Sequence, residues 1–153
     1  MLLLFWMGLL FAAEDEENIR AELQAPVDPG AVVAVLTDTA KIRAALPNSC
    51  MRKARDAGDG RFELVYSVDL FRRKLTADVR RRSDTRVEWD HLGKKGFITR
   101  FEVEQAELTT IRMTTYVSPP GKPFRNYYAK RIAPAWEQCQ KRFLENVVEG
   151  MSN

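Results

Sequence analysis

The sequence predicts an α+β domain in which a curved antiparallel sheet of about six or seven strands wraps around a long C-terminal helix. Two observations support this fold class. Between residues 61 and 117, apolar residues recur at every second position in several short runs, which is the period of half-buried strands. From Asn126 to Val148 they recur at every third or fourth position, as in an amphipathic helix. Such a long apolar helix face needs a hydrophobic partner, and a curved sheet supplies one.

The first part of the chain predicts one strand and two short helices. The strand is indicated by an apolar alternation at Ile19, Ala21, Leu23 and Ala25. Asp28 followed by Pro29 is typical of a helix start, with aspartate as the cap and proline as the first helical residue. Asp38 is expected to cap a second short helix, which ends before Pro47.

The middle of the chain predicts an antiparallel meander, because short turns separate its strands. The expected strands lie near residues 50–55, 62–70, 75–79, 87–91, 97–103 and 109–117. Glycine-containing turns are predicted at Asp56–Gly60 and Gly93–Gly96. The inward positions change from even to odd near Asp69–Lys74. A hairpin turn or bulge there would explain the change, with Arg72, Arg73 and Lys74 as its basic tip.

The predicted C-terminal helix has one apolar and one polar face. The apolar face comprises Tyr128, Ile132, Ala135, Trp136, Cys139, Phe143 and Val147. The polar face is expected to contain Lys130, Arg131, Glu137, Gln140, Lys141, Arg142 and Glu145. Pro134 lacks a backbone donor, so it should kink the helix or mark its start after a looser segment. A mobile gate over a cavity mouth is the functional interpretation of this proline.

Residues 18–150 are predicted to form a single domain behind an apolar leader, residues 1–13, and an acidic leader, residues 14–17. The first thirteen residues carry no charge, and they are too few to span a bilayer, which needs about 20. They suit the hydrophobic region of a secretory signal peptide. This interpretation predicts a periplasmic or secreted protein; otherwise the protein is expected to be cytoplasmic.

The net charge of +3 is unevenly distributed, because four acidic residues stand together at 14–17 and leave the remainder more basic. Basic runs occur at residues 52–55, 72–74 and 80–82. Such clusters can dock anionic lipid head groups, so Arg72, Arg73 and Lys74 are candidates for membrane docking. A solvated basic face is the alternative. Nucleic acid is the least favoured partner, because the aromatic residues that would stack on bases are predicted to point inward.

The two cysteines, Cys50 and Cys139, lie far apart in the sequence. They could form a disulfide in an oxidising compartment. However, Cys139 falls on the apolar face of the last helix, where a buried thiol behaves as a small hydrophobic group. Two free thiols are therefore the prediction, and the disulfide remains the alternative.

Element order and four short motifs resemble the helix-grip superfamily, also called SRPBCC. The motifs are Ala25–Asp28, Leu36–Asp38, Leu46–Pro47 and Val87–Trp89. This superfamily includes START lipid-transfer domains, birch-pollen-allergen-like proteins and polyketide cyclases. The sequence most resembles its bacterial polyketide-cyclase/coenzyme-Q-binding-like branch. The resemblance implies an apolar cavity between the sheet and the last helix. It also implies a lipid, quinone, sterol or polyketide-like ligand; a minority of members catalyse cyclisation or dehydration.

The inward positions supply the candidate cavity residues. They are Leu64, Tyr66, Val68, Leu75, Trp89, His91, Phe97, Phe101, Ile111, Met113, Trp136 and Phe143. Polar atoms from Tyr66, Trp89, His91, Thr99, Thr109 and Thr115 also fall on these faces. A ligand or enclosed water could supply the partners that buried polar atoms need.

The sequence contains little that favours catalysis. His91 is the only histidine, so no histidine-based metal cluster can form, and no cofactor is expected. There is no Gly-x-Ser-x-Gly nucleophile motif. The first hypothesis is therefore a non-enzymatic carrier or sensor of a hydrophobic small molecule. The alternatives are a polyketide cyclase or dehydratase that uses His91 or Tyr66 as acid–base groups, and an interaction domain with a filled core. The oligomeric state has no clear sequence signal.

Overall fold

A computed structural model describes residues 17–47, 49–68, 71–92, 97–118 and 121–151. Within these ranges the strands are β1 (Glu17–Ala25), β2 (Met51–Gly58), β3 (Arg61–Val68), β4 (Phe71–Ser83), β5 (Arg86–Leu92), β6 (Ile98–Gln105) and β7 (Thr109–Val117). The helical elements are α2 (Pro29–Leu36), α3 (Thr39–Ala44), α4 (Arg125–Tyr127), the π-helical turn η1 (Tyr128–Ile132) and α5 (Ala133–Met151).

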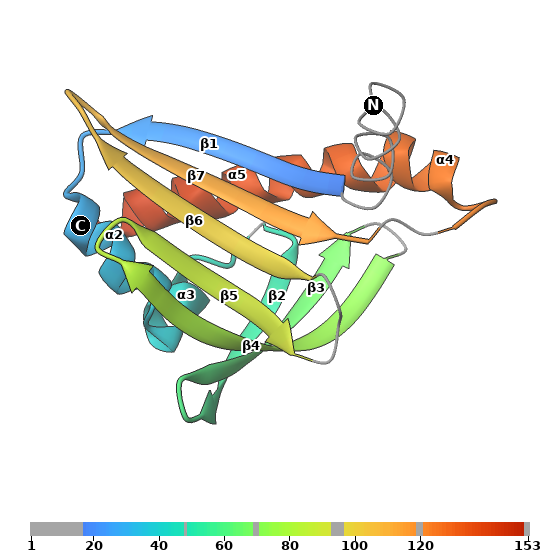
Figure 1. The fold of residues 1–153 in the computed structure, drawn as a ribbon, viewed down its shortest axis with the longest axis horizontal. Helices are drawn as coiled ribbons and strands as arrows, with labels where there is room; N and C mark the ends of the chain where they lie inside the picture. The colour runs from blue at the N-terminus through green and yellow to red at the C-terminus, as the bar shows by residue number, and fades with distance from the viewer. Residues whose placement is uncertain (1–16, 48, 69–70, 93–96, 119–120, 152–153) are drawn as a thin grey trace, which may run out of the picture.

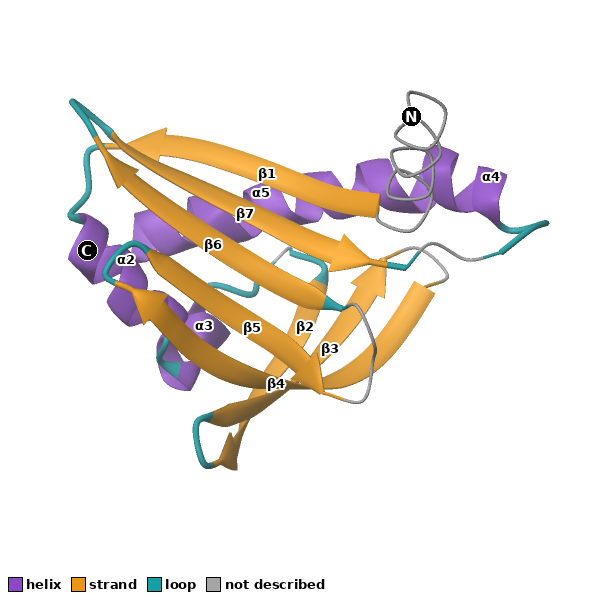
Figure 2. Cartoon of the chain, viewed as in Figure 1, coloured by secondary structure: helices purple, strands orange, loops and turns teal. Residues whose placement is uncertain are grey.

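The strands form one antiparallel sheet with the order β1-β7-β6-β5-β4-β3-β2. The sheet curves over α5, and α2 and α3 cover one end of it (Figures 1 and 2). The predicted α+β helix-grip architecture is thus confirmed. The signal-peptide and acidic-leader predictions fall on residues 1–17, of which 1–16 lie outside the described residues. Among the described residues, no helix is both long and apolar enough to cross a membrane.

The N-terminal elements begin where the capping residues predict. The Asp28 carboxylate accepts a hydrogen bond from the backbone N–H of Ala31 at 3.0 Å. The Asp38 carboxylate does the same for the N–H of Ala40 at 2.9 Å. Both caps satisfy donors that a helix leaves without an internal partner, so each fixes the first turn of its helix.

The hairpin between β2 and β3 is tighter than the sequence predicts. Asp56 still pairs with Phe62 in the sheet, so the turn begins two residues later than expected. Its residues Gly58, Asp59 and Gly60 all have positive φ, at 79°, 55° and 73°. Glycine adopts this backbone region without steric cost, which explains the two glycines around one aspartate.

The prediction that Arg72, Arg73 and Lys74 form a hairpin tip is wrong, because all three belong to strand β4. They pair with Ser67, Tyr66 and Val65 of β3, and the β3–β4 pairing continues to Val68 and Phe71. Residues that lie opposite one another share a face of the sheet. Even positions of β3 therefore face odd positions of β4, which accounts for the change in parity without a longer loop. The three basic side chains are exposed, and membrane docking stays a prediction.

The outer face of the sheet carries several cross-strand ion pairs. Glu88 accepts hydrogen bonds from Arg82 at 2.9 Å and from Arg100 at 3.1 Å. Burial opposes the ionisation of Glu88, but the two arginines outweigh it and lower the pKa of this carboxyl group. Arg80 pairs with Asp90 at 3.5 Å, and Arg112 lies within 3.8 Å of both Glu102 and Glu104. These carboxylates therefore act as cross-strand partners rather than as an acid–base pair.

The last helix is interrupted just before Pro134. The chain forms the short helix α4, then the π-helical turn η1, and Pro134 is the second residue of α5. Proline cannot donate to the carbonyl four residues earlier, and the wider turn before it is consistent with that missing bond. The predicted interruption is confirmed, although helical backbone also precedes the proline. The gate over a cavity mouth remains a prediction.

The core between the sheet and α5 contains a deep aromatic cluster that Trp89 organises. The Trp89 ring lies 5.1 Å from Phe62, 4.6 Å from Phe101 and 5.8 Å from Phe143, measured between ring centroids. Its Nε1–H donates to the carbonyl oxygen of Leu36 at 2.9 Å. This hydrogen bond attaches the C-terminal end of α2 to the middle of the sheet.

Candidate functional site

A second group of rings lies nearer the end of the sheet at which β3 and β5 finish. It contains Tyr66 from β3, His91 from β5, Phe97 just before β6, and Trp136 from α5. The His91 and Phe97 ring centroids are 4.5 Å apart in an edge-to-face arrangement. Tyr66 lies 5.6 Å from His91, 5.7 Å from Phe97 and 5.5 Å from Trp136. These four residues form the outer aromatic group, as distinct from the deep cluster around Trp89.

A chain of buried polar side chains runs beside the outer aromatic group. The Thr99 hydroxyl lies 3.2 Å from His91 Nε2, 3.5 Å from the Tyr66 hydroxyl and 3.1 Å from the Thr115 hydroxyl. The Gln140 amide Nε2 donates to the Thr115 hydroxyl. We call these five residues the buried polar cluster: Tyr66, His91, Thr99, Thr115 and Gln140.

Strand register explains why these side chains meet. Thr99 of β6 lies directly opposite Thr115 of β7, so both hydroxyls point to the same inner face. On the other side, Thr99 lies opposite Trp89 of β5, and His91 is the next inward residue along that strand. Gln140 comes from α5, which packs against the inner face of the sheet, and it reaches Thr115 from there. Four strands and one helix must therefore be in place before the cluster exists.

Gln140 lies on the inner face of α5, opposite to the polar face on which its polarity predicts it. It is fully buried, although the polar face of the helix was expected to hold it. Gln140 lies four residues after Trp136 and three before Phe143, and this spacing puts all three on one side of a helix. The helical period thus indicated an inward position, but the polarity of the side chain argued against it. Leu144 is buried for the same reason of spacing.

Two atoms of the buried polar cluster have no hydrogen-bond partner among the described residues. They are His91 Nδ1 and Gln140 Oε1, and both side chains are almost completely shielded from solvent. An unsatisfied buried polar atom costs about 1–3 kcal/mol, and natural cores contain few of them. Two such atoms therefore lie in one cluster, each with an unused hydrogen-bonding capacity.

Burial fixes the protonation states of the cluster. Desolvation lowers the pKa of His91 from its usual 6.5 to about 3, so the imidazole is neutral at physiological pH. Desolvation also raises the pKa of the Tyr66 hydroxyl above its ordinary value, and the contact with Thr99 only partly opposes this. The site therefore offers neutral donors and acceptors and no net charge.

All twelve predicted cavity residues point inward and are buried, and the structure divides them between two places. Tyr66, His91, Phe97 and Trp136 form the outer aromatic group. The others belong to the surrounding core, with Trp89, Phe101 and Phe143 in the deep cluster. Of four pockets lined by described residues, one includes a member of the twelve, namely Val68. The twelve residues are thus buried around an incompletely satisfied polar cluster.

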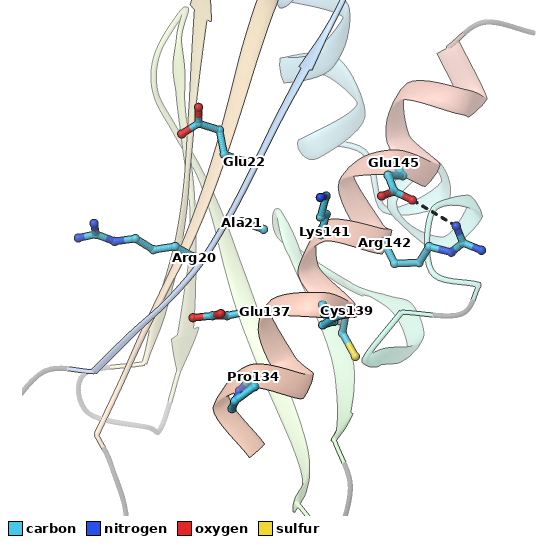
Figure 3. Close-up of a pocket in the computed structure, with 10 residues that line it drawn as sticks. Arg20, Ala21, Glu22, Pro134, Glu137, Cys139, Lys141, Arg142 and Glu145 are labelled. Atoms are coloured by element: carbon cyan, nitrogen blue, oxygen red, sulfur yellow. Dashed lines mark hydrogen bonds and ion pairs between the residues drawn. The ribbon is translucent and has the colours of Figure 1, made fainter. Parts of the chain in front are cut away.

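Two pockets flank α5, one on each side. The first has a volume of about 790 Å³ and lies between β1 and α5, with charged residues such as Arg20, Glu137 and Arg142 in its lining (Figure 3). The second, of about 570 Å³, lies between α5 and the paired strands β2 and β3, and it includes Val68. We call this second one the β2–α5 pocket. Within the described residues, no three histidine, cysteine or acidic side chains converge to hold a metal ion.

Replacing Gln140 by leucine is expected to raise the free energy of unfolding by about 1 kcal/mol, because it removes the partnerless Oε1 at the cost of one hydrogen bond. Thr115 keeps Thr99 as a partner in this variant. Chemical denaturation followed by circular dichroism measures the change. The exposed Gln138, two residues earlier on the same helix, provides the control substitution Gln138→Leu, which should leave stability nearly unchanged. If Gln140→Leu loses more stability than the control, the conclusion that Gln140 Oε1 has no hydrogen-bond partner is wrong.

Comparison with known proteins identifies the fold of the chain but not its activity. No family model and no curated protein sequence matches the chain. The solution structure of KanY matches with a TM-score of 0.75 and 16% identity over 90% of this chain and 99% of KanY. TTHA0849 from Thermus thermophilus matches with a TM-score of 0.74 and 13% identity, over 89% of this chain and 97% of that one.

A third similar structure is the di-domain ARO/CYC BexL from the BE-7585A biosynthetic pathway. It matches with a TM-score of 0.66 and 12% identity, over 96% of this chain and 53% of BexL. The chain therefore has the helix-grip fold. Because one fold hosts many activities, the function must be argued from the site itself.

Proposed function

We propose that this protein binds a hydrophobic small molecule with a hydroxyl group between the sheet and α5, beside the buried polar cluster. The observation that carries this proposal is the pair of partnerless polar atoms, His91 Nδ1 and Gln140 Oε1, beside the outer aromatic group. A ligand site is typically an apolar space with a few polar groups that fix orientation. The helix-grip fold supplies that arrangement here, with rings on the sheet and on α5.

The chemistry of the two atoms favours a hydroxyl over a charged group. Gln140 Oε1 can only accept a hydrogen bond, whereas His91 Nδ1 can donate or accept, depending on the tautomer. A hydroxyl both donates and accepts, so it can satisfy either atom. A carboxylate would face the Gln140 oxygen without a compensating cation in the cluster, because His91 is neutral. Burying such an unpaired charge is costly.

The same protonation states support binding rather than acid–base catalysis. An efficient general base has a pKa near the working pH, whereas burial holds the pKa of His91 near 3. The Tyr66 hydroxyl retains its proton because burial raises its pKa. A cyclase or dehydratase mechanism would need one of these groups to exchange protons readily at neutral pH. A carrier or sensor needs only their hydrogen bonds.

Ligand uptake requires the outer aromatic group to open, since its side chains are buried. The π-helical turn η1 directly precedes α5 and buries Tyr128 and Ile132. Single π-helical turns inside helices occur often at functional sites. In this proposal η1 and Pro134 form the hinge that lets the first turns of α5, including Trp136, move away from Phe97.

Binding of a naphthol and of naphthalene tests the proposal directly. The two probes share an apolar body and differ by one hydroxyl, and changes in tryptophan fluorescence report their binding. We expect the naphthol to bind about tenfold more tightly, which corresponds to about 1.4 kcal/mol for the added hydrogen bond. In Gln140→Leu the two affinities should converge, whereas the matched control Gln138→Leu should keep the difference. Equal affinities in the wild type, or no binding of either probe, would refute the proposed function.

A further inference from the structure

The fold brings the two cysteines of the chain together. Cys50 immediately precedes the edge strand β2, and Cys139 lies in α5. The Cys50 thiol is buried and donates a hydrogen bond to the carbonyl oxygen of Trp136 at 3.7 Å, one turn before Cys139. The Cys50 and Cys139 side chains lie close enough to shift each other's pKa. Both are free thiols, as predicted, although the fold places them close to each other.

Cys139 is the accessible member of the pair. It is half-buried, whereas Cys50 is almost completely shielded from solvent. Cys139 lines the β2–α5 pocket, together with the basic residues Arg43 and Arg52 and the hydroxyl residues Ser49 and Ser67. Figure 3 shows its sulfur directed away from β1. A small oxidant that enters the β2–α5 pocket would thus meet Cys139 first and Cys50 behind it.

The environment of the pair gives its two thiols different reactivities. The neighbouring Cys50 thiol lowers the pKa of the Cys139 thiol, burial opposes this, and the positive charge of Arg52 adds to the lowering. Burial raises the pKa of the Cys50 thiol well above its ordinary value, and the neighbouring Cys139 thiol adds to that increase. Because the thiolate is the nucleophile, Cys139 is the more reactive sulfur. Cys50 remains a protonated donor beside it.

We propose that the β2–α5 pocket is an oxidation site, in which a peroxide oxidises Cys139 and Cys50 then resolves it to an intramolecular disulfide. The Cys139 thiolate attacks one peroxide oxygen, the O–O bond breaks, and the leaving hydroxide or alkoxide takes up a proton. The product is a sulfenic acid on Cys139. The Cys50 sulfur then attacks the Cys139 sulfur, the S–O bond breaks, and water leaves with the Cys50 proton. Two thiols are oxidised and one peroxide is reduced to water, or to water and an alcohol.

The disulfide would join the beginning of β2 to α5 across the β2–α5 pocket. Ala135 and Cys139, both in the first half of α5, line this pocket, so the bond would hold the part of the helix that the proposed hinge moves. This consequence rests on the proposed function: the oxidised protein should take up its hydrophobic ligand more slowly than the reduced protein. Reduction by a thiol would restore uptake.

Peptide mapping of the full chain under non-reducing conditions tests the oxidation site. Reduced protein is treated with hydrogen peroxide, remaining thiols are alkylated, and the digest is analysed by mass spectrometry. We expect a linked pair of peptides containing Cys50 and Cys139, lighter by two hydrogens than the separate peptides, which dithiothreitol converts back. An alkylated Cys50 beside an over-oxidised Cys139, or disulfides only between molecules, would overturn the proposal.

Two variants separate the roles of the cysteines. In Cys50→Ala, Cys139 should stop at the sulfenic acid and react with dimedone. In Cys139→Ser, which alters a half-buried position, Cys50 should remain reduced and be alkylated only after unfolding. Rapid oxidation of Cys50 in Cys139→Ser would contradict the assigned order. The disulfide is detected by mass and ligand uptake by naphthol fluorescence. Failure of ligand binding therefore leaves the disulfide result unaffected.

Discussion

Replacing Trp89 by alanine will lower the free energy of unfolding by about 3–5 kcal/mol, the usual cost of removing a large buried ring. The Trp89 ring contacts three aromatic side chains of the deep cluster, from β3, β6 and α5. The variant also leaves the Leu36 carbonyl oxygen without its indole donor. Denaturant-induced unfolding, followed by circular dichroism, measures the loss. Because a domain of this size has only about 5–15 kcal/mol of stability, the variant should be close to unfolding at 37 °C.

Trp89→Phe is the matched control, because it keeps a ring at this position and removes only the indole N–H and part of the volume. It should cost less than half as much as the alanine substitution. Equal losses for the two variants would show that the hydrogen bond to Leu36, rather than the aromatic packing, dominates. A loss below about 1 kcal/mol in Trp89→Ala would contradict the central position of Trp89 in the core.

Acidification will destabilise the protein through His91. The folded state holds His91 neutral down to a pKa of about 3, whereas the unfolded chain protonates it near 6.5. Between these values the unfolded state binds more protons, so stability falls as the pH falls. The loss of stability caused by His91 reaches about 3 kcal/mol at about pH 4, since each pKa unit is worth about 1.4 kcal/mol. Above the pKa of His91 in the unfolded chain, this residue causes no loss of stability.

His91→Gln is the control for the acid effect, because glutamine can keep a hydrogen bond to Thr99 and does not titrate in this range. Its stability should change less between about pH 7 and about pH 4 than that of the wild type, by about 3 kcal/mol. Glu88 also contributes to acid sensitivity, because its pKa is lowered, but it does so in both proteins. Parallel pH profiles for the two proteins would mean that His91 is solvated in the folded state.

The fold was predictable because its elements carry strong periodic signals. Inward positions of β5, β6 and β7 follow a strict alternation, and the residues at these positions are buried as expected. Asp28 and Asp38 are capping residues with a local mechanism, so their positions fix helix starts without tertiary information. The order of these elements then leaves few ways to cover one apolar helix with one sheet.

The candidate site was predictable only in part, because it depends on how elements meet. His91, Tyr66 and the inward threonines could be read from strand parity, but their shared hydrogen bonds depend on register between strands. Gln140 was missed because its polarity outweighed its helical position. Lys74 and its basic neighbours were misplaced because a short turn and a longer loop produce the same parity change. The pairing of Cys50 with Cys139 required the path of α5 past the edge strand.

The two clusters of the core differ in how completely their polar atoms are paired. The deep cluster is well packed, and its Trp89 donor has a carbonyl partner. The buried polar cluster, by contrast, leaves His91 Nδ1 and Gln140 Oε1 without partners among the described residues. A local cost in stability within the core is typical of functional sites. We therefore expect that substitutions which improve stability at Gln140 will weaken ligand binding.

Native mass spectrometry of the purified protein, followed by organic extraction and analysis of the extract, tests the ligand-binding account most directly. We expect a mass peak that exceeds the mass of the protein alone by the mass of one bound ligand. The extract should contain an apolar molecule with a hydroxyl group. This species should be depleted in Gln140→Leu and retained in Gln138→Leu. Protein that carries no ligand, and that also fails to bind the naphthol, would contradict the account and indicate a domain whose interior is simply filled.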